Sequence, residues 1–206
     1  TVGADDAPAM GPNISRFGRG RTGTGLTDGL AAVADQMVNE DIAAYEHHYG
    51  LWYERRRDDH LMGRQEDGAV IPPFYEQPFA RTGEGTAWDG LSKYDLTKPN
   101  PWYWQRLKDF SRLGEERGLA LFHQHFFQHN ILEAGAHWVD CPWRPANNVN
   151  DMGLPEPPPF IGDKRLFMAH NFYDLSYEPR RELYRQYIRQ CLDALADSPN
   201  VIQLTS

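Results

Sequence analysis

The sequence predicts an α/β fold with parallel strands, and the order of its apolar patterns carries this prediction. Two short apolar runs, 119–126 and 201–206, each follow an amphipathic helical pattern. Gly118 precedes the first run, and the turn residues Ser198-Pro199-Asn200 precede the second. Short apolar runs placed directly after helices are typical of parallel strands that are covered on both faces. Alternation of strand and helix along the chain is the order of a parallel α/β fold.

Three helices are expected around these strands. The first begins at Thr27, a residue that can cap a helix, and ends at Gly50. Its apolar positions, at close to helical spacing, are Leu30, Val33, Ala34, Met37, Val38, Ile42, Tyr45 and Tyr49. Asn100-Pro101 begins the second helix, with Asn as cap and Pro at the first helical position, and Gly118 ends it. Pro179 opens the third.

Length and loop content predict an incomplete barrel with long loops after its strands. A complete (β/α)8 TIM barrel takes about 250 residues, whereas this chain has 206 and contains two long stretches, 61–98 and 129–165, without a clear period. Long loops in compact domains are commonly functional. We expect an extended arm over residues 1–26 and the first half of a (β/α)8 barrel over 27–206, with a short strand at 51–56 and the chain ending at about strand 4.

Composition excludes several classes of function. The net charge is −8 and no sustained basic stripe is present, which argues against nucleic acid as a partner. No segment has the pattern of a transmembrane span or a signal peptide, so no membrane partner is expected. The two cysteines, Cys141 and Cys191, lack metal-ligand spacing, and Cys191 falls on the apolar face of a helix, where a thiol behaves as a small hydrophobe.

Polar groups gather at the end of the first apolar run. Side chains alternate along a strand, so Leu121, His123 and His125 share one face. Polar groups at the carboxyl end of a parallel strand are those that α/β enzymes use to contact ligands. The His123–His125 pair has three interpretations: hydrogen bonding to sugar hydroxyls, which we favour, metal binding, and histidines satisfied within the core. We expect no cofactor.

The C-terminal block carries a resemblance to a known superfamily. The segments Tyr173-Asp-Leu-Ser, Arg181-Glu-Leu-Tyr-Arg-Gln-Tyr-Ile-Arg and Ser198-Pro-Asn-Val-Ile-Gln-Leu resemble the third-helix to fourth-strand region of (β/α)8 glycoside hydrolases. Gly118-Leu-Ala-Leu-Phe-His is similar to their third strand, so the resemblance covers roughly residues 100–206. It implies a secreted or periplasmic carbohydrate-active enzyme that takes an oligo- or polysaccharide. It also implies an acid/base glutamate just after strand four, beyond Ser206, and the remainder of the barrel as a partner.

Candidate site residues follow from the chemistry of sugars. Amides and imidazoles match the donor and acceptor character of a hydroxyl, exposed aromatic rings stack on sugar faces, and an arginine can bind the carboxylate of a uronic acid. The expected substrate-binding residues are His123, His125, His129, Asn130, Trp138, Trp143, Asn171, Tyr173 and Arg57. Asp58, Asp59 and Asp174 are weak candidates for catalytic carboxylates, since no spacing singles any of them out.

Two other classes of function remain open at this level. A metal-dependent hydrolase of the amidohydrolase type would hold its metal with His123 and His125. A non-catalytic glycan-binding protein on a barrel scaffold would use the same aromatic and amide residues without the carboxylates. Metal content separates the first alternative from the rest, and catalytic carboxylates separate a glycosidase from a binding protein.

Overall fold

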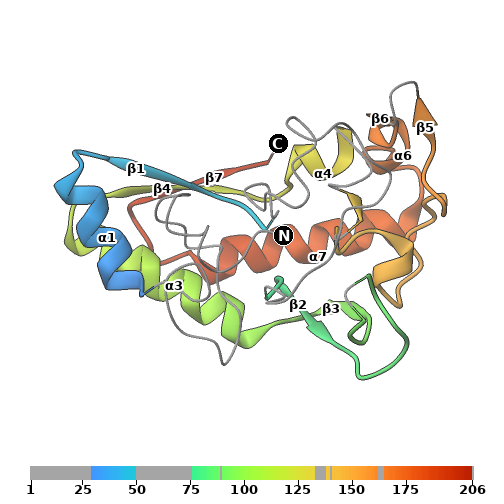
Figure 1. Ribbon diagram of the computed structural model, residues 1–206, viewed down its shortest axis with the longest axis horizontal. Helices are drawn as coiled ribbons and strands as arrows, with labels where there is room; N and C mark the ends of the chain where they lie inside the picture. The colour runs from blue at the N-terminus through green and yellow to red at the C-terminus, as the bar shows by residue number, and fades with distance from the viewer. Residues whose placement is uncertain are drawn as a thin grey trace.

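The computed structural model describes residues 29–49, 76–88, 90–132, 138–139, 141–161 and 165–205 (Figure 1). Its helices and strands are α1 (Leu30–Asn39), β1 (Ala44–His47), β2 (Phe79–Arg81), β3 (Tyr94–Pro99), α3 (Pro101–Glu116), β4 (Ala120–Gln124), α4 (Gln128–Leu132), the 3-10 turn η3 (Pro145–Asn147), β5 (Phe160–Ile161), β6 (Arg165–Leu166), α6 (Ala169–Phe172), α7 (Glu178–Ala194) and β7 (Val201–Leu204). The predicted arm over 1–26 and the predicted strand at 51–56 lie outside the described residues.

A parallel three-stranded sheet organises the chain and confirms the α/β prediction. Its strand order is β1-β4-β7, so each strand pairs with the next parallel strand along the chain. In the register, His47 lies beside His123, and His123 lies beside Gln203. Along the chain, helix α3 lies between β1 and β4, and helix α7 lies between β4 and β7. This order gives the strand–helix–strand repeat expected of parallel strands.

The helices cover one face of this sheet. Figure 1 shows α1, α3 and α7 along one side of the three strands, with the β2–β3 hairpin beyond them. The Tyr45 ring packs edge-on against Phe110 of α3, at 5.6 Å between centroids. On the opposite face Ile202 is 48% exposed and Leu204 is 38% exposed. Each strand therefore has one covered and one open side.

The first helix is shorter than predicted, and residues 44–47 form a strand. The helix ends after Asn39, where Asp41 adopts the left-handed conformation with φ 56°. The amide of Asp41 donates to the Val38 carbonyl and that of Ile42 donates to the Met37 carbonyl, the bond pattern of a Schellman motif. Asp is among the few non-glycine residues that tolerate this conformation. The helix prediction through Tyr49 was therefore wrong.

The second helix begins as predicted. The Asn100 side chain accepts hydrogen bonds from the Trp102 amide at 3.1 Å and the Tyr103 amide at 3.5 Å. Its amide nitrogen donates to the Gln77 carbonyl at 3.0 Å, so the same residue attaches the preceding chain to α3. Gly118, just beyond the end of the helix, has φ +72°, a conformation that residues with a side chain rarely adopt.

Both stretches predicted as loops contain some regular structure. β2 and β3 form an antiparallel hairpin with an irregularity between Phe79 and Ala80. Between 138 and 161 the backbone is held mainly by asparagine side chains. Asn147 donates to the Val139 and Cys141 carbonyls, and Asn150 accepts from the Leu96 amide. These amides satisfy backbone groups that a helix or sheet would otherwise pair.

No helix in the described ranges is long and apolar enough to cross a bilayer.

Asn200 joins α3, β4 and β7, and its replacement by aspartate should destabilise the fold. Its amide nitrogen donates to the Ser111 and Leu119 carbonyls at 3.0 Å each. Asn200→Asp replaces this donor by an anionic oxygen facing two carbonyls, so we expect a loss of about 2 kcal/mol or more in the free energy of unfolding, measured by urea denaturation. Asn171→Asp is the matched control at an exposed position and should change it by less than about 0.5 kcal/mol. Equal shifts in the two variants would contradict the role of Asn200.

Candidate functional site

Three histidines gather on the helix-covered face of the sheet. His47 comes from β1, and His123 and His125 come from β4 and the residue that follows it. All three are buried, with exposed fractions of 1%, 0% and 1%. They lie there because side chains of equal parity share a face of a strand, and because the parallel register places His47 beside His123.

His47 and His123 form a hydrogen-bonded pair. Their Nδ1 atoms lie 3.3 Å apart, and the rings stack at 5.4 Å between centroids with an angle of 21°. In a pair of neutral imidazoles one Nδ1 carries the hydrogen and the other accepts it. The Nε2 atom of His123 is buried and has no hydrogen-bond partner.

Gln203 fixes the orientation of His125. The Gln203 amide nitrogen donates to the Cys191 carbonyl at 3.1 Å, which leaves its oxygen facing His125. That oxygen lies 2.7 Å from Nε2 of His125, so Nε2 is the nitrogen that carries the hydrogen. The other ring nitrogen, Nδ1, is buried without a partner and bears a lone pair.

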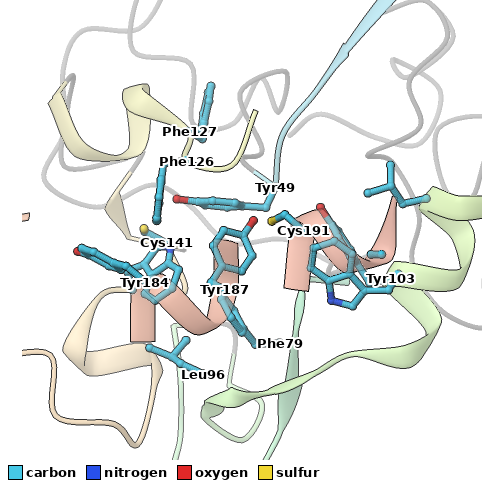
Figure 2. Packing of buried hydrophobic residues seen from close by; sticks show 14 of the residues in the cluster. Tyr49, Phe79, Leu96, Tyr103, Phe126, Phe127, Cys141, Tyr184, Tyr187 and Cys191 are labelled. Atoms are coloured by element: carbon cyan, nitrogen blue, oxygen red, sulfur yellow. The ribbon is translucent and has the colours of Figure 1, made fainter. Parts of the chain in front are cut away.

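Cys191 of helix α7 lies close to His123 and His125 of the β4 region. It lies on the inner face of α7, fully buried, and its Sγ and one ring nitrogen from each of His123 and His125 all lie within 4.8 Å of one another. Figure 2 shows Cys191 and Tyr187 projecting from α7 toward Tyr49. The Tyr49 and Tyr187 rings meet edge-on at 6.3 Å between centroids. We call His123, His125 and Cys191 the N₂S cluster.

Burial keeps these groups uncharged. Burial first, and then neighbouring histidines, lowers the pKa of His47, and the same causes lower the pKa of His123 to about 3. Burial also lowers the pKa of His125, against the hydrogen bond to Gln203. Burial raises the pKa of the Cys191 thiol to about 12. At neutral pH the cluster therefore consists of neutral imidazoles and, without a bound cation, a protonated thiol.

Several residues predicted to bind sugar lie in the core instead. His123 and His125 face the helices, so neither presents a ring to solvent. Trp138 and Trp143 are both 0% exposed, which makes the prediction of stacking platforms wrong for this structure. Trp143 packs on Phe79 at 5.0 Å between centroids and on Tyr184 at 5.1 Å. Burial of these large rings removes much apolar area from water, which stabilises the fold.

Two other predicted residues are accessible at the carboxyl side of the sheet. Asn171 and Tyr173 are exposed on and just after α6, and Tyr173 is 40% exposed. Phe167 and His170 lie close by, with rings 5.0 Å apart and both exposed. In Figure 1, α4, α6 and the β5–β6 hairpin lie beyond the carboxyl ends of β1, β4 and β7. We call Phe167, His170, Asn171 and Tyr173 the α6 surface.

The Asp174 carboxylate forms hydrogen bonds within a turn. It accepts hydrogen bonds from the Ser176 amide and hydroxyl, at 2.9 Å each. These bonds, and the nearby Arg180, lower the pKa of Asp174. A carboxyl held ionised in this way is poorly suited to donate a proton as a general acid.

The remaining candidates fall outside what the structure describes. Arg57, Asp58 and Asp59 lie in the segment between 50 and 75, which is not described. His129 and Asn130 belong to α4, and their side chains are likewise outside the description.

A small cleft lies away from these residues. It has a volume of about 50 Å³ and opens between the β2–β3 hairpin and helices α3 and α7, lined by residues such as Phe79, Trp104 and Tyr187. No carboxylate, histidine or cysteine among the described residues lines it. It therefore offers shape without acid–base or metal-binding chemistry.

Sequence reasoning missed Cys191, His47 and Gln203 as members of one site. Cys191 was assigned only to an apolar helix face, and His47 fell within a predicted helix. The sequence does carry one indication of the strand. Tyr45, His47 and Tyr49 occupy every second position, a spacing that places them on one face of a strand.

A family model described as a domain of unknown function, DUF6298, matches residues 2–206. No curated protein and no solved structure shows significant similarity to the chain.

The buried imidazoles should make stability sensitive to acid. The folded-state pKa values of His47, His123 and His125 lie below the ordinary value of 6.5, so at mildly acidic pH the unfolded chain binds protons that the folded chain does not. Their contribution is therefore fully present above about pH 6.5 and is lost as pH falls, by about 1.4 kcal/mol per pH unit for each histidine. Urea denaturation between pH 7.5 and 5 in metal-free buffer measures this slope.

His123→Gln should flatten the slope, whereas His170→Gln, at an exposed position, should leave it unchanged. An unchanged slope in His123→Gln would contradict the assignment.

Proposed function

The chain belongs to the DUF6298 family of unknown function, and from its geometry we propose that it forms part of a carbohydrate-active enzyme, a glycoside hydrolase built on a (β/α)8 barrel. The α6 surface carries this proposal. It places an exposed tyrosine, an amide and an imidazole beyond the carboxyl ends of parallel strands. That is the side on which α/β folds bind ligands.

The winding of the sheet supports a barrel. Its strands follow one another in chain order, β1-β4-β7, and α3 and α7 lie on the same face. A doubly wound sheet reverses its strand order and places helices on both faces, whereas a barrel keeps one direction and one helical layer.

The open face of the sheet suits a barrel interior. Ile202 and Leu204 are exposed there, Phe122 is half-buried, and Glu46 and Gln124 add polar groups. In a closed barrel these side chains would form interior layers with residues from further strands. The remainder of the barrel is thus the partner that the proposal requires, and it would also supply the acid/base glutamate that the superfamily carries after strand four.

The surface chemistry of α6 suits a sugar. A tyrosine ring offers an apolar face for the C–H side of a pyranose, and an amide both donates and accepts hydrogen bonds, as a hydroxyl does. A polysaccharide is too large to enter a cell intact, so we propose a secreted or periplasmic location.

The geometry favours a glycosidase or glycan-binding protein over an amidohydrolase-type enzyme. His123 and His125 are buried beside Cys191 of α7, so a metal held there would not meet a substrate at the exposed α6 surface. A glycan-binding protein would use the α6 surface in the same way and would differ by leaving the sugar intact.

Replacement of Tyr173 should weaken sugar binding. We expect the purified protein to bind one class of oligosaccharide on a glycan panel, and Tyr173→Ala to reduce the affinity for that sugar about tenfold or more in calorimetric titration, because the ring's buried area is lost. Asn171→Ala should weaken binding through lost hydrogen bonds.

Leu175→Ala is the matched control, since Leu175 is an exposed apolar residue two positions from Tyr173. It should bind like the unmodified protein. Equal losses in Leu175→Ala and Tyr173→Ala, or no bound glycan at all, would overturn the proposed sugar site. Release of reducing ends from the bound oligosaccharide distinguishes a hydrolase from a binding protein.

A further inference from the structure

We propose that His123, His125 and Cys191 form a binding site for a divalent transition-metal ion of the zinc type, which fastens helix α7 to strand β4. This inference goes beyond the proposed function and does not depend on it. The site lies on the helix-covered face of the sheet, whereas the proposed sugar site lies beyond the carboxyl ends of the strands.

The convergence of donor atoms is the first argument. Two ring nitrogens and the Cys191 sulfur lie within 4.8 Å of one another, from two adjacent elements of the core. In a four-coordinate zinc site with bonds of about 2.0–2.3 Å, ligand atoms are separated by less than 4 Å. Small side-chain rotations would therefore bring the three donors onto one ion.

The unsatisfied nitrogens are the second argument. Nε2 of His123 and Nδ1 of His125 are both buried and lack hydrogen-bond partners. A buried polar atom without a partner costs about 1–3 kcal/mol. One ring nitrogen from each of these histidines lies within 4.8 Å of the Cys191 sulfur, so a cation bound among the three residues would give the unpartnered lone pairs a ligand.

The hydrogen bonds behind the ligands are the third argument. Metal-bound histidines usually donate their other N–H to a second residue, which sets the tautomer and the ring orientation. His125 has this arrangement, with Nε2 facing the Gln203 oxygen at 2.7 Å and Nδ1 left without a hydrogen-bond partner. His123 has the same arrangement when its Nδ1 donates to Nδ1 of His47, 3.3 Å away. Each histidine thus keeps one ring nitrogen free of a hydrogen, as a metal ligand requires.

The donor set selects the kind of ion. Two imidazoles and one thiolate suit zinc, whereas calcium and magnesium prefer oxygen ligands. On binding, the Cys191 S–H bond breaks, the sulfur forms a bond to the ion, and the proton leaves to solvent. Three protein donors leave one position of a tetrahedral ion for a further ligand. The ion would join β4 to α7 as a structural cross-link.

Metal binding can be tested on the purified full-length protein without any sugar. After treatment with a chelator, Co²⁺ alone is added as a spectroscopic substitute for zinc. We expect one equivalent to bind, with the visible d–d bands of a tetrahedral ion and a near-ultraviolet sulfur-to-cobalt charge-transfer band, and Zn²⁺ to displace it. Absence of the charge-transfer band in the unmodified protein would overturn the proposal.

Variants assign the ligands. Cys191→Ser should abolish the charge-transfer band, and His125→Gln should weaken cobalt binding at least tenfold. Cys141→Ser is the matched control, since Cys141 is also a fully buried free cysteine but lies outside the N₂S cluster; it should retain the full spectrum. A band that survives in Cys191→Ser and vanishes in Cys141→Ser would contradict the assignment.

Gln203→Leu tests the positioning role of Gln203. It should weaken binding about 10- to 100-fold while retaining the charge-transfer band, as is usual when a hydrogen bond behind a metal ligand is lost. An unchanged cobalt affinity in Gln203→Leu would contradict the proposal that Gln203 fixes the tautomer of His125 for metal binding. Because the cobalt spectrum of the unmodified protein is informative by itself, a variant that fails to fold leaves the test intact.

Discussion

The packing of α7 against the face of β4 that bears Leu121, His123 and His125 is the contact on which the rest of the structure depends. It places polar imidazoles where water is excluded, so a ring nitrogen that lacks a partner within the protein costs free energy. The register of the parallel sheet supplies two partners, because His47 and Gln203 occupy the strands on either side of His123. A shift of one residue in either strand would turn these partners to the open face.

Helix α7 is held at both ends by polar groups, which explains how a buried polar face is tolerated. Near its start, Arg180 is 2% exposed and donates to the Met152 carbonyl at 2.9 Å and to the Asp174 carbonyl at 2.5 Å. Toward its end, the Cys191 carbonyl accepts from Gln203. The segment around Met152 is itself fixed by the asparagine side chains of 147–150. The irregular segment and the helix thus stabilise each other.

The sequence predicted the elements whose signals are local. Asn100 and Pro101 determine the start of α3 through the cap, and the apolar run before Gln124 gives β4. It failed at 44–47, because Tyr45, His47 and Tyr49 also continue the apolar positions of a helix. Only the left-handed Asp41 and the pairing with β4 decide between the two, and pairing is not a local property. Trp143 was misplaced for a related reason, since proline and arginine beside it suggested a surface loop.

The two faces of the sheet explain why a histidine motif at a strand end is buried beneath the helices. Parity along β4 sends Phe122 and Gln124 to the open face, and His123 and His125 toward the helices. A position near the carboxyl end of a strand therefore does not determine on which face of the sheet the side chain lies. Leu121 carries that information, because a fully buried leucine of the same parity marks the covered face. The ligand contacts that we propose therefore lie beyond the strand, on the α6 surface, whereas the polar groups beneath α7 lie in the core that supports it.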